Sequence, residues 1–436
     1  MAGDNAHDAH GDRVARQAAV EAAGGDWQVA APTDDTPSHS ALRRRLGARP
    51  PVGTLAEREA GARARQAGAE AVAAPPRPAA FNWQSVGGKN YLTPVRDQGD
   101  CGSCVAFGTA ATIEGTAKVR YGATLNIDIS EAQLFYCIGR NSGATCAEGW
   151  WPNFAFDGAG NPGITDGAHF PYSAHDQACG LRSGWQDEVT KVAQWHEIYD
   201  VEQMKQWIAT KGPLTTCFTV YTDFFDYAGG IYKHVYGGVE GGHCVSVVGY
   251  NDTKGYWVAK NSWNTWWGDQ GFLRIAYGEC AFDYEMYAVD SLIVPATGTS
   301  PLYRYWNRTT HDHFYTSSWA ELGTAGHGYD FQETQCYLYS AAKAGTVPLH
   351  RFWNTTRKDH AYSLDRNEYG HAADGYKYEG IVGYAFAAAA AKALPLYRYW
   401  SAANNDHLYT TNPAEGAAAA GYALQKTACW VPGGPM

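Results

Sequence analysis

The chain lacks both an excess of positive charge and a long apolar run. Its 436 residues carry 34 Lys and Arg against 44 Asp and Glu, a formal net charge of −10, which argues against a nucleic-acid partner. A membrane-spanning helix needs about 20 apolar residues. The alanine tract at 387–391 is far shorter and is followed by Lys392, so we expect no membrane span.

Residues 1–80 contain no aromatic side chain except Trp27 and are rich in Ala, Arg, Gly, Pro and Asp. Residues 1–8 lack the apolar core of a secretory signal, so a signal has been removed or export follows another route. With little to pack, the segment is predicted to be flexible. One helix is credible over Leu55–Val72, because Thr54 and Glu57 form a capping-box pattern and no proline interrupts the run.

A glycine-rich turn precedes a cysteine in the stretch 98–107, QGDCGSCVAF. Cys104 begins the run 104–121, in which apolar residues recur at helical spacing. A thiol in the first turn of a helix has a lowered pKa, because backbone N–H groups and the helix dipole stabilise the thiolate. The same groups can bind an oxyanion, and Gln98 can direct an amide N–H to the same point. Cys104 is therefore the candidate nucleophile.

Such a nucleophile needs a base, and the base needs an orienting partner. His243 follows two glycines at the entrance to a predicted strand, 244–250, and Asn261 follows a second predicted strand, 256–260. His243 lies 139 residues after Cys104, and Asn261 lies 18 residues after His243. In this order and at this spacing, the three residues indicate one catalytic site.

Together with Gln98, Ser262-Trp263 and the stretch 267–272 (WGDQGF), these residues resemble the papain family of cysteine peptidases, whose Cys-to-His and Asn separation they match. The resemblance covers 81–295 and implies an α+β fold with a helical lobe, a β-sheet lobe and the site between them. The expected elements agree with that order: helices at 104–121 and 130–137, then strands at 214–221, 244–250, 256–260 and 271–275.

The resemblance implies that Cys104 attacks a peptide carbonyl as a thiolate paired with His243. Asn261 is expected to hold the imidazole, with Trp263 shielding it from water. Gln98 and the backbone N–H of Cys104 are expected to bind the oxyanion.

Two positions depart from the common family pattern. Val105 stands where most members have Trp, and Gly242 stands where many have Asp. Neither carries the chemistry. The chain has no paired-histidine insertion of the kind that blocks the cleft in exopeptidase relatives, so an endopeptidase is favoured.

The same matching suggests residues that bind substrate. Glu285 falls at the floor of S2, the pocket that binds the P2 side chain of the substrate, where a carboxylate would accept Arg or Lys. The pocket walls fall at Cys217 and Cys244, and the rim that pairs with substrate backbone at Gly149, Trp150 and Trp151. The alternative is an apolar pocket with Glu285 on the surface.

Ten cysteines are present. The resemblance implies the bridges Cys101–Cys146 and Cys137–Cys179, although sequence alone does not fix connectivity. The family's third bridge is not expected, because Cys280 has no partner in 233–240. The pairing of five cysteines stays open: Cys217, Cys244, Cys280, Cys336 and Cys429. Two bridges favour an oxidising compartment, secreted or extracytoplasmic. Cys101 and Cys104 have a zinc-like spacing, but no second pair matches it, so no metal or cofactor is predicted.

After a linker at 296–300 the chain repeats with a period of 47 residues. The motif Pro-Leu-x-Arg-aromatic-Trp recurs at 301, 348 and 395, followed by Asp-His pairs, a tyrosine and a Gly-Tyr pair: Asp312-His313, Asp359-His360, Asp406-His407; Tyr315, Tyr362, Tyr409; Gly328-Tyr329, Gly375-Tyr376, Gly421-Tyr422. Such a period indicates one supersecondary unit stacked three times, over 301–347, 348–394 and 395–436. We expect a closed threefold all-β domain, β-trefoil-like, with a small propeller as second choice.

The repeats resemble ones appended to bacterial secreted hydrolases. Their Asp-His pairs fit either a metal site or, as we favour, turn anchors in which the carboxylate orients the imidazole. Exposed Tyr and Trp beside Asp and Arg would suit stacking on sugar rings, so a carbohydrate or cell-surface ligand is a hypothesis. Cys336 and Cys429 occupy the same place in repeats one and three, with Gly383 in repeat two.

The sequence thus favours a papain-like cysteine endopeptidase with a C-terminal targeting domain. Residues 1–80 are a candidate propeptide, although they lack the long helical pattern common in family propeptides. Two alternatives stay open: a non-catalytic binding protein on a peptidase-like scaffold, and an acyl transferase that uses the same Cys-His-Asn site.

Overall fold

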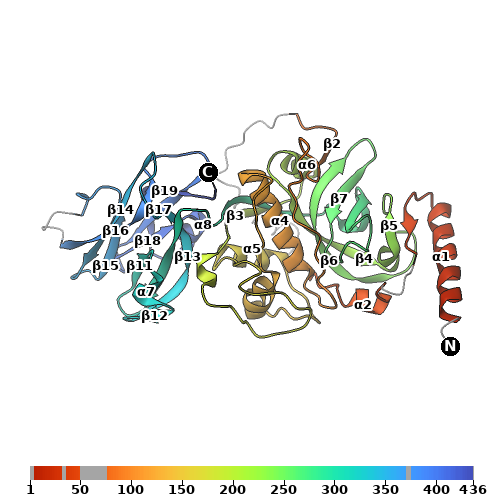
Figure 1. Cartoon of the computed structure of the whole chain (residues 1–436), viewed down its shortest axis with the longest axis horizontal. Coiled ribbons are helices and arrows are strands. Elements are labelled where there is room, and N and C mark those ends of the chain that lie inside the picture. Colours follow the sequence, from red (N-terminus) through yellow and green to blue (C-terminus); the bar gives the residue numbers. More distant parts are fainter. Residues whose placement is uncertain (1–3, 32–35, 50–75, 370–374, 436) are drawn as a thin grey trace. The chain divides into compact units, whose positions relative to one another are not determined.

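The computed structural model describes residues 4–31, 36–49, 76–369 and 375–435 (Figure 1). Its described residues fall into two compact units. Unit 1 lies within Met1–Gly158, Gly167–Leu181 and Trp195–Asp290, and unit 2 within Ala159–Asp166, Arg182–Gln194 and Ser291–Met436. Three short stretches of the predicted peptidase-like region, 159–166, 182–194 and 291–295, therefore belong to unit 2. The helix predicted at Leu55–Val72 lies outside the described residues.

The helices that precede the repeats are concentrated before residue 161. They are α1 (Asp4–Ala22), α2 (His39–Arg43), α4 (Cys104–Tyr121), η1 (Gln133–Ile138), η2 (Gly139–Ser142), α5 (Pro152–Gly160), η3 (Trp185–Asp187), α6 (Val201–Thr210), η4 (Thr222–Asp226) and η5 (Glu279–Ala281). Helix α4 has the predicted bounds and is buried from Cys104 to Ala117 except at Ala111. Apolar residues on all its sides are typical of a central helix. Among the described residues, no helix is both long and apolar enough to cross a membrane.

A seven-stranded sheet, whose strands other than β2 come after α5 in the chain, carries the larger hydrophobic core. Its strands are β2 (Ala80–Asn82), β3 (Lys191–Ile198), β4 (Leu214–Tyr221), β6 (Val239–Asn251), β7 (Tyr256–Lys260), β8 (Phe272–Ala276) and β9 (Met286–Ile293). Their order is β3-β9-β4-β6-β7-β8, with β2 added to β6. Strands β4 and β7 have the predicted bounds, whereas β6 begins five residues earlier than predicted. The α+β order expected from the sequence is present.

The N-terminal segment packs on this sheet lobe, where the sequence predicted a flexible tail. Strand β1 (Gln28–Val29) pairs with β5 (Tyr227–Gly229). Trp27 is fully buried, contacts Tyr227 and Tyr232, and donates its indole N–H to the Lys233 carbonyl at 3.0 Å. One large aromatic side chain therefore supplies the apolar anchor that composition suggested was missing.

In unit 2 each sequence repeat forms a group of three antiparallel strands, and the three groups are joined in one ten-stranded sheet. The strands are β10 (Thr299–Asn307), β11 (Asp312–Thr316) and β13 (Tyr329–Tyr339); β14 (Thr346–Asn354), β15 (Asp359–Ser363) and β16 (Tyr376–Phe386); β17 (Ala393–Ser401), β18 (Asp406–Thr410) and β19 (Ala423–Pro432). Short β12 (Ala325–Gly326) and helices α7 (Trp319–Leu322) and α8 (Pro413–Ala418) lie between them. Strands β10, β14 and β17 each pair on both sides and carry bulges at equivalent positions.

The stretch 182–194 also contributes to unit 2. Val189 donates its backbone N–H to the Tyr337 hydroxyl at 2.8 Å, and the Thr334 hydroxyl donates to the Gln186 carbonyl at 2.7 Å. The Lys191 ammonium and the Glu333 carboxylate, both buried, lie 2.6 Å apart. A buried charge is tolerated only when it is paired in this way.

Three tyrosines from successive repeats bind one another's backbone in a ring. Each hydroxyl donates to the carbonyl of one neighbour and accepts from that neighbour's N–H, at 2.7–2.9 Å: Tyr362 with Tyr315, Tyr409 with Tyr362, and Tyr315 with Tyr409. All three rings are buried and meet edge to face. The exposed tyrosines expected for sugar stacking are, at these positions, internal.

We predict that Tyr362→Phe lowers the free energy of unfolding of the full chain by about 1–3 kcal/mol, because both backbone groups of Tyr315 lose their buried partner. Tyr378 on β16 is exposed, and Tyr378→Phe is the matched control, with an expected change within about 0.5 kcal/mol. Urea denaturation followed by far-UV circular dichroism measures both. Equal stability of the two variants would contradict the role assigned to the ring.

Candidate functional site

Helix α4 packs on strand β6 (Figure 1), which brings Cys104 to the part of the strand that carries His243 and Cys244. Gly108 allows close approach, because a Cβ at this position would lie 3.3 Å from the backbone N of Val245. One turn further, the Thr112 hydroxyl bonds the Ser246 hydroxyl at 2.9 Å. Residues 104, 108 and 112 share one helix face. Cys104 therefore lies against Cys244, whose backbone hydrogen-bonds the thiol.

The imidazole of His243 is held by Asn261 from the end of β7. His243 Nε2 lies 2.7 Å from Asn261 Oδ1, which fixes Nδ1 as the free ring nitrogen, buried and without a hydrogen-bond partner. The ring of Trp263 covers the imidazole, with centroids 4.6 Å apart. The Asn261 and Trp263 side chains thus orient and enclose the base, as a catalytic His requires.

Gln98 is fixed in one orientation by two residues that sequence reasoning did not assign to it. Its Oε1 accepts from the Ser262 hydroxyl at 2.7 Å and from the Trp263 indole at 3.2 Å. The amide nitrogen therefore faces the Cys101–Cys104 turn, where it donates to the Cys101 carbonyl at 2.8 Å. The family-like Asn-Ser-Trp spacing was the signal that could have found these contacts.

Residues 45–49 cross the site and cover it. Gln98 Nε2 also donates to the Arg45 carbonyl at 2.8 Å, and a backbone group of Gly47 hydrogen-bonds the Cys104 thiol. The backbone N–H groups of Gly47 and Ala48 donate to the Gly242 carbonyl at 3.1 and 3.0 Å. The Arg45 carbonyl thus occupies the Gln98 amide N–H that was predicted to bind an oxyanion.

Two glycines let this segment approach so closely. A Cβ on Gly47 would lie 1.9 Å from the carbonyl oxygen of Gly102, and one on Gly149 would lie 1.9 Å from the carbonyl oxygen of Gly47. Trp150 donates its backbone N–H to that Gly47 carbonyl at 2.8 Å and accepts from the N–H of Arg49 at 2.9 Å. The rim predicted at Gly149–Trp151 therefore pairs with a peptide backbone, here the chain's own.

Burial under this segment suppresses ionisation of both reactive groups. It raises the pKa of the Cys104 thiol to about 11, against a weaker lowering by the backbone groups around it. Burial also lowers the pKa of His243 to about 4, although the hydrogen bond that its Nε2 donates to Asn261 opposes that shift. At pH 7 the covered site therefore holds a neutral thiol and a neutral imidazole.

Three disulfides are present among the described residues. Cys101–Cys146 and Cys137–Cys179 occur as the resemblance implied. Cys217 and Cys244, which sequence reasoning left unpaired, form a third, between directly opposite residues of β4 and β6. The described cysteines outside these bridges are Cys104, Cys280, Cys336 and Cys429.

Glu285 lies beside β4, because the Thr216 hydroxyl donates to its backbone carbonyl at 3.1 Å. Its side chain is 5% exposed, so the surface alternative is wrong. The Tyr287 hydroxyl donates to its Oε1 at 3.0 Å. Burial, followed by the Glu285 charge, raises the pKa of Tyr287 well above 10, which keeps the hydroxyl a donor to the carboxylate.

Behind Asn261, a small cavity is lined by charged side chains that sequence reasoning did not single out: Arg96, Glu114, Glu131 and Lys260. Arg96 reaches Glu131 at 2.8 Å and Glu114 at 3.2 Å. Lys260 donates to the Thr93 hydroxyl at 2.9 Å, and burial lowers its pKa to about 8. These residues join the loop before α4 to the end of β7 and so support Asn261 from behind.

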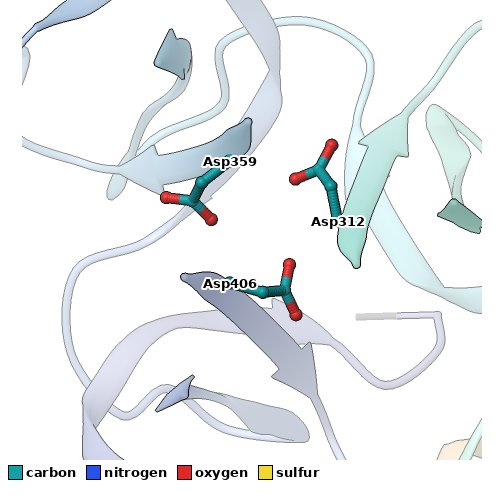
Figure 2. A group of neighbouring side chains, drawn as sticks. All are labelled: Asp312, Asp359 and Asp406. Atoms are coloured by element: carbon teal, nitrogen blue, oxygen red, sulfur yellow. The ribbon is translucent and has the colours of Figure 1, made fainter. Parts of the chain in front are cut away.

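In unit 2, three aspartates lie together, with one carboxylate oxygen of each within 4.8 Å of the others (Figure 2). Each is buried, and each accepts from the backbone N–H and the Nδ1 of a histidine in another repeat: Asp406 from His313, Asp312 from His360, and Asp359 from His407. A tyrosine of its own repeat donates to each as well: Tyr422, Tyr329 and Tyr376. Both oxygens of every carboxylate are thus engaged, and the anchoring is between repeats, not within each Asp-His pair as predicted.

Comparison with known proteins gives a family match for the peptidase-like region and another for the repeats. A family model described as "Papain family cysteine protease" matches residues 77–290. A second model, described as a domain of unknown function (DUF5648), matches residues 279–386 and 301–432.

Two relatives and one solved structure illustrate the similarity. The chain is 32% identical over 210 residues to a "Cathepsin B-like CP3" of Giardia intestinalis, covering 45% of this chain and 69% of that protein. It is 33% identical over 204 residues to a "Cathepsin L-like proteinase" of Fasciola hepatica, covering 46% of this chain but only 60% of that relative's length. A digestive procathepsin L2 proteinase from Tenebrio molitor larval midgut matches with a TM-score of 0.52 and 25% identity, over 65% of this chain and 90% of that one.

We predict that Gly47→Val speeds alkylation of Cys104 by iodoacetamide at pH 7 by at least about tenfold. The added side chain cannot fit against Gly102, so the covering segment leaves and the thiol regains solvent and a lower pKa. Mass spectrometry of the full chain gives the rate at Cys104. Gly238 provides the control, because an added Cβ there would have open space around it. Gly238→Val should be alkylated at the wild-type rate. A Gly47→Val rate equal to that of Gly238→Val would refute the covering role.

Proposed function

Because the chain belongs to the papain family of cysteine proteases, we propose that it hydrolyses peptide bonds through a Cys104 acyl-enzyme. The observation that carries the proposal is the pairing of His243 Nε2 with Asn261 Oδ1 at 2.7 Å, which leaves Nδ1 without a partner and available as the base. A cysteine at a helix start, a base and an orienting amide are the parts that nucleophilic catalysis needs.

The reaction follows from the roles of these groups. His243 takes the thiol proton, and the Cys104 thiolate adds to the carbonyl carbon of the scissile bond. The oxyanion is bound by Gln98 Nε2 and the backbone N–H of Cys104, each such donor being worth about 10²–10³ in rate. The imidazolium then protonates the leaving amine, and water, activated by the same imidazole, releases the acid product and the thiol.

We propose further that residues 43–49 keep the full chain latent. Support comes from the Arg45 carbonyl, which occupies Gln98 Nε2, and from the parallel bridge between Ala48 and Trp150. While the segment is bound, the oxyanion donor and the rim are unavailable to a substrate. The three disulfides support a secreted or extracytoplasmic setting, since such bridges persist under oxidising conditions.

For unit 2 we infer a closed threefold arrangement in which the repeats meet through β11, β15 and β18. The Tyr315, Tyr362 and Tyr409 ring and the three Asp–His pairs support it, because each set runs from the third repeat back to the first. Inner strands that meet at one axis favour the propeller-like alternative over a trefoil. A targeting role and a sugar ligand remain hypotheses, and the buried tyrosines do not favour the latter.

We predict that Cys104→Ala lowers kcat/KM on fluorogenic dipeptide amides by about 10⁴-fold or more, because the nucleophile is lost. The assay uses the full chain under reducing conditions, after self-processing or in the Gly47→Val form. Cys280→Ala removes a thiol outside the site and should keep wild-type turnover. Activity in Cys104→Ala would rule out the acyl-enzyme, and acyl transfer to an added amine in place of water would favour the transferase alternative.

We predict a basic P2 preference that depends on Glu285. The supporting observations are its buried carboxylate and its closeness to the Cys217–Cys244 wall. In Glu285→Leu the kcat/KM ratio of Arg-Arg to Phe-Arg amides should fall at least about tenfold, since a buried charge-assisted hydrogen bond contributes about 1.5–3 kcal/mol. Glu279→Leu, six residues earlier in η5, should leave the ratio unchanged. A strong Phe preference that is the same in wild type and Glu285→Leu would remove Glu285 from the pocket.

A further inference from the structure

The Arg49 side chain is bound by the rim of the cleft through three separate contacts. Its Nε donates to the Glu148 carbonyl at 2.6 Å, and its Nη2 donates to the Glu148 carboxylate at 3.3 Å. Its guanidinium carbon lies over the Trp151 ring, 4.5 Å from the centroid. A planar face, a carboxylate and a carbonyl together match the fork and the flat shape of a guanidinium better than an ammonium.

The position of this subsite follows from the backbone contacts of the covering segment. Gly47 lies at Cys104, and Ala48 is the residue bridged to Trp150. Arg49 is therefore the third residue counted outward from the nucleophile. With Gly47 taken as the first position and Ala48 as the second, a side chain in this place corresponds to the third residue from the scissile bond, P3.

Three further arginines, next to or within the covering segment, also contact acidic side chains. Arg45 is 2.6 Å from Asp97 and lies over the Trp266 ring, 5.8 Å from its centroid. Arg44 is 2.6 Å from Asp100, and Arg43 bonds Glu240. Four arginines within seven residues thus each meet a different acidic side chain, which is charge complementarity along the whole cleft.

We propose that Glu148 and Trp151 form an arginine-binding S3 subsite, which the latent chain fills with Arg49 and the active enzyme uses to select substrates with arginine at P3. The proposal rests on the proposed peptidase function. The proposal does not depend on the direction of the bound backbone, because the long apolar stem of arginine lets the guanidinium reach one place from either chain direction. Substrates of this class are basic polypeptides, which suits the acidic rim.

The test compares four tripeptide amides that differ only at P3: Arg, Lys, citrulline and Ala. Citrulline keeps the shape of arginine and removes its charge. With the full chain after self-processing or limited proteolysis, kcat/KM for Arg should exceed that for citrulline about fivefold, as expected for one exposed charge pair, with Lys between them. In Glu148→Gln the ratio of Arg to citrulline should fall to near one.

Glu202→Gln is the matched control, because Glu202 has a similar side-chain exposure, 67% against 70% for Glu148, and also pairs with an arginine, Arg77. It should keep the wild-type ratio. Turnover of all four peptides with equal kcat/KM for Arg and citrulline, or a ratio unchanged in Glu148→Gln, overturns the subsite while leaving the peptidase intact. Turnover of none of them by the processed chain overturns the peptidase proposal and the subsite with it.

Discussion

The close contact between helix α4 and strand β6 is the constraint on which the catalytic arrangement depends. The proposed nucleophile, Cys104, and the proposed base, His243, are 139 residues apart in sequence, and no local structure could hold them together. Gly108 has no side chain to separate the two elements, and the Thr112–Ser246 hydrogen bond fixes their register one turn further. A larger residue at 108 would move the start of the helix, and with it Cys104, by a distance that matters for catalysis.

The covering segment is held by contacts that are individually modest. Its ion pairs lie at the rim, where an exposed pair contributes roughly 0–1 kcal/mol, and its backbone hydrogen bonds each contribute about 1 kcal/mol. Arg43 lowers the pKa of Glu240 through a hydrogen bond and its charge. The pair therefore stabilises the closed form above the ordinary pKa of a glutamate, and this contribution is lost as the pH falls through the lowered value. Acid consequently weakens the attachment of the segment at Glu240.

Much of the catalytic unit was predictable because its elements have local signals. The bounds of α4, β4 and β7 follow from hydrophobic periodicity, and Cys104, His243 and Asn261 follow from spacing. The packing of the N-terminal segment was not predictable, because it depends on Trp27, a few scattered aliphatic side chains such as Val20 and Leu42, and a glycine without special conformation. Gly47 matters only through its distance from Gly102, and no pattern along the chain reports such a distance. The Cys217–Cys244 bridge was missed for a related reason: it depends on the strand register, which the sequence alone did not specify.

In unit 2 the repeat was evident from the sequence. Its Asp-His motif, however, was expected to form contacts within each repeat, and in the structure the contacts run between repeats. Asp312 serves His360, Asp359 serves His407, and Asp406 serves His313. The arginines follow the same cycle, since Arg351 pairs with Glu321, Arg398 with Glu368, and Arg304 with Glu415. Each repeat therefore supplies an aspartate and a glutamate to the next repeat and receives the equivalent pair from the preceding one. Deleting any repeat would leave a buried carboxylate and a buried imidazole without partners, at a cost of several kcal/mol, so the three repeats should fold and unfold as one body.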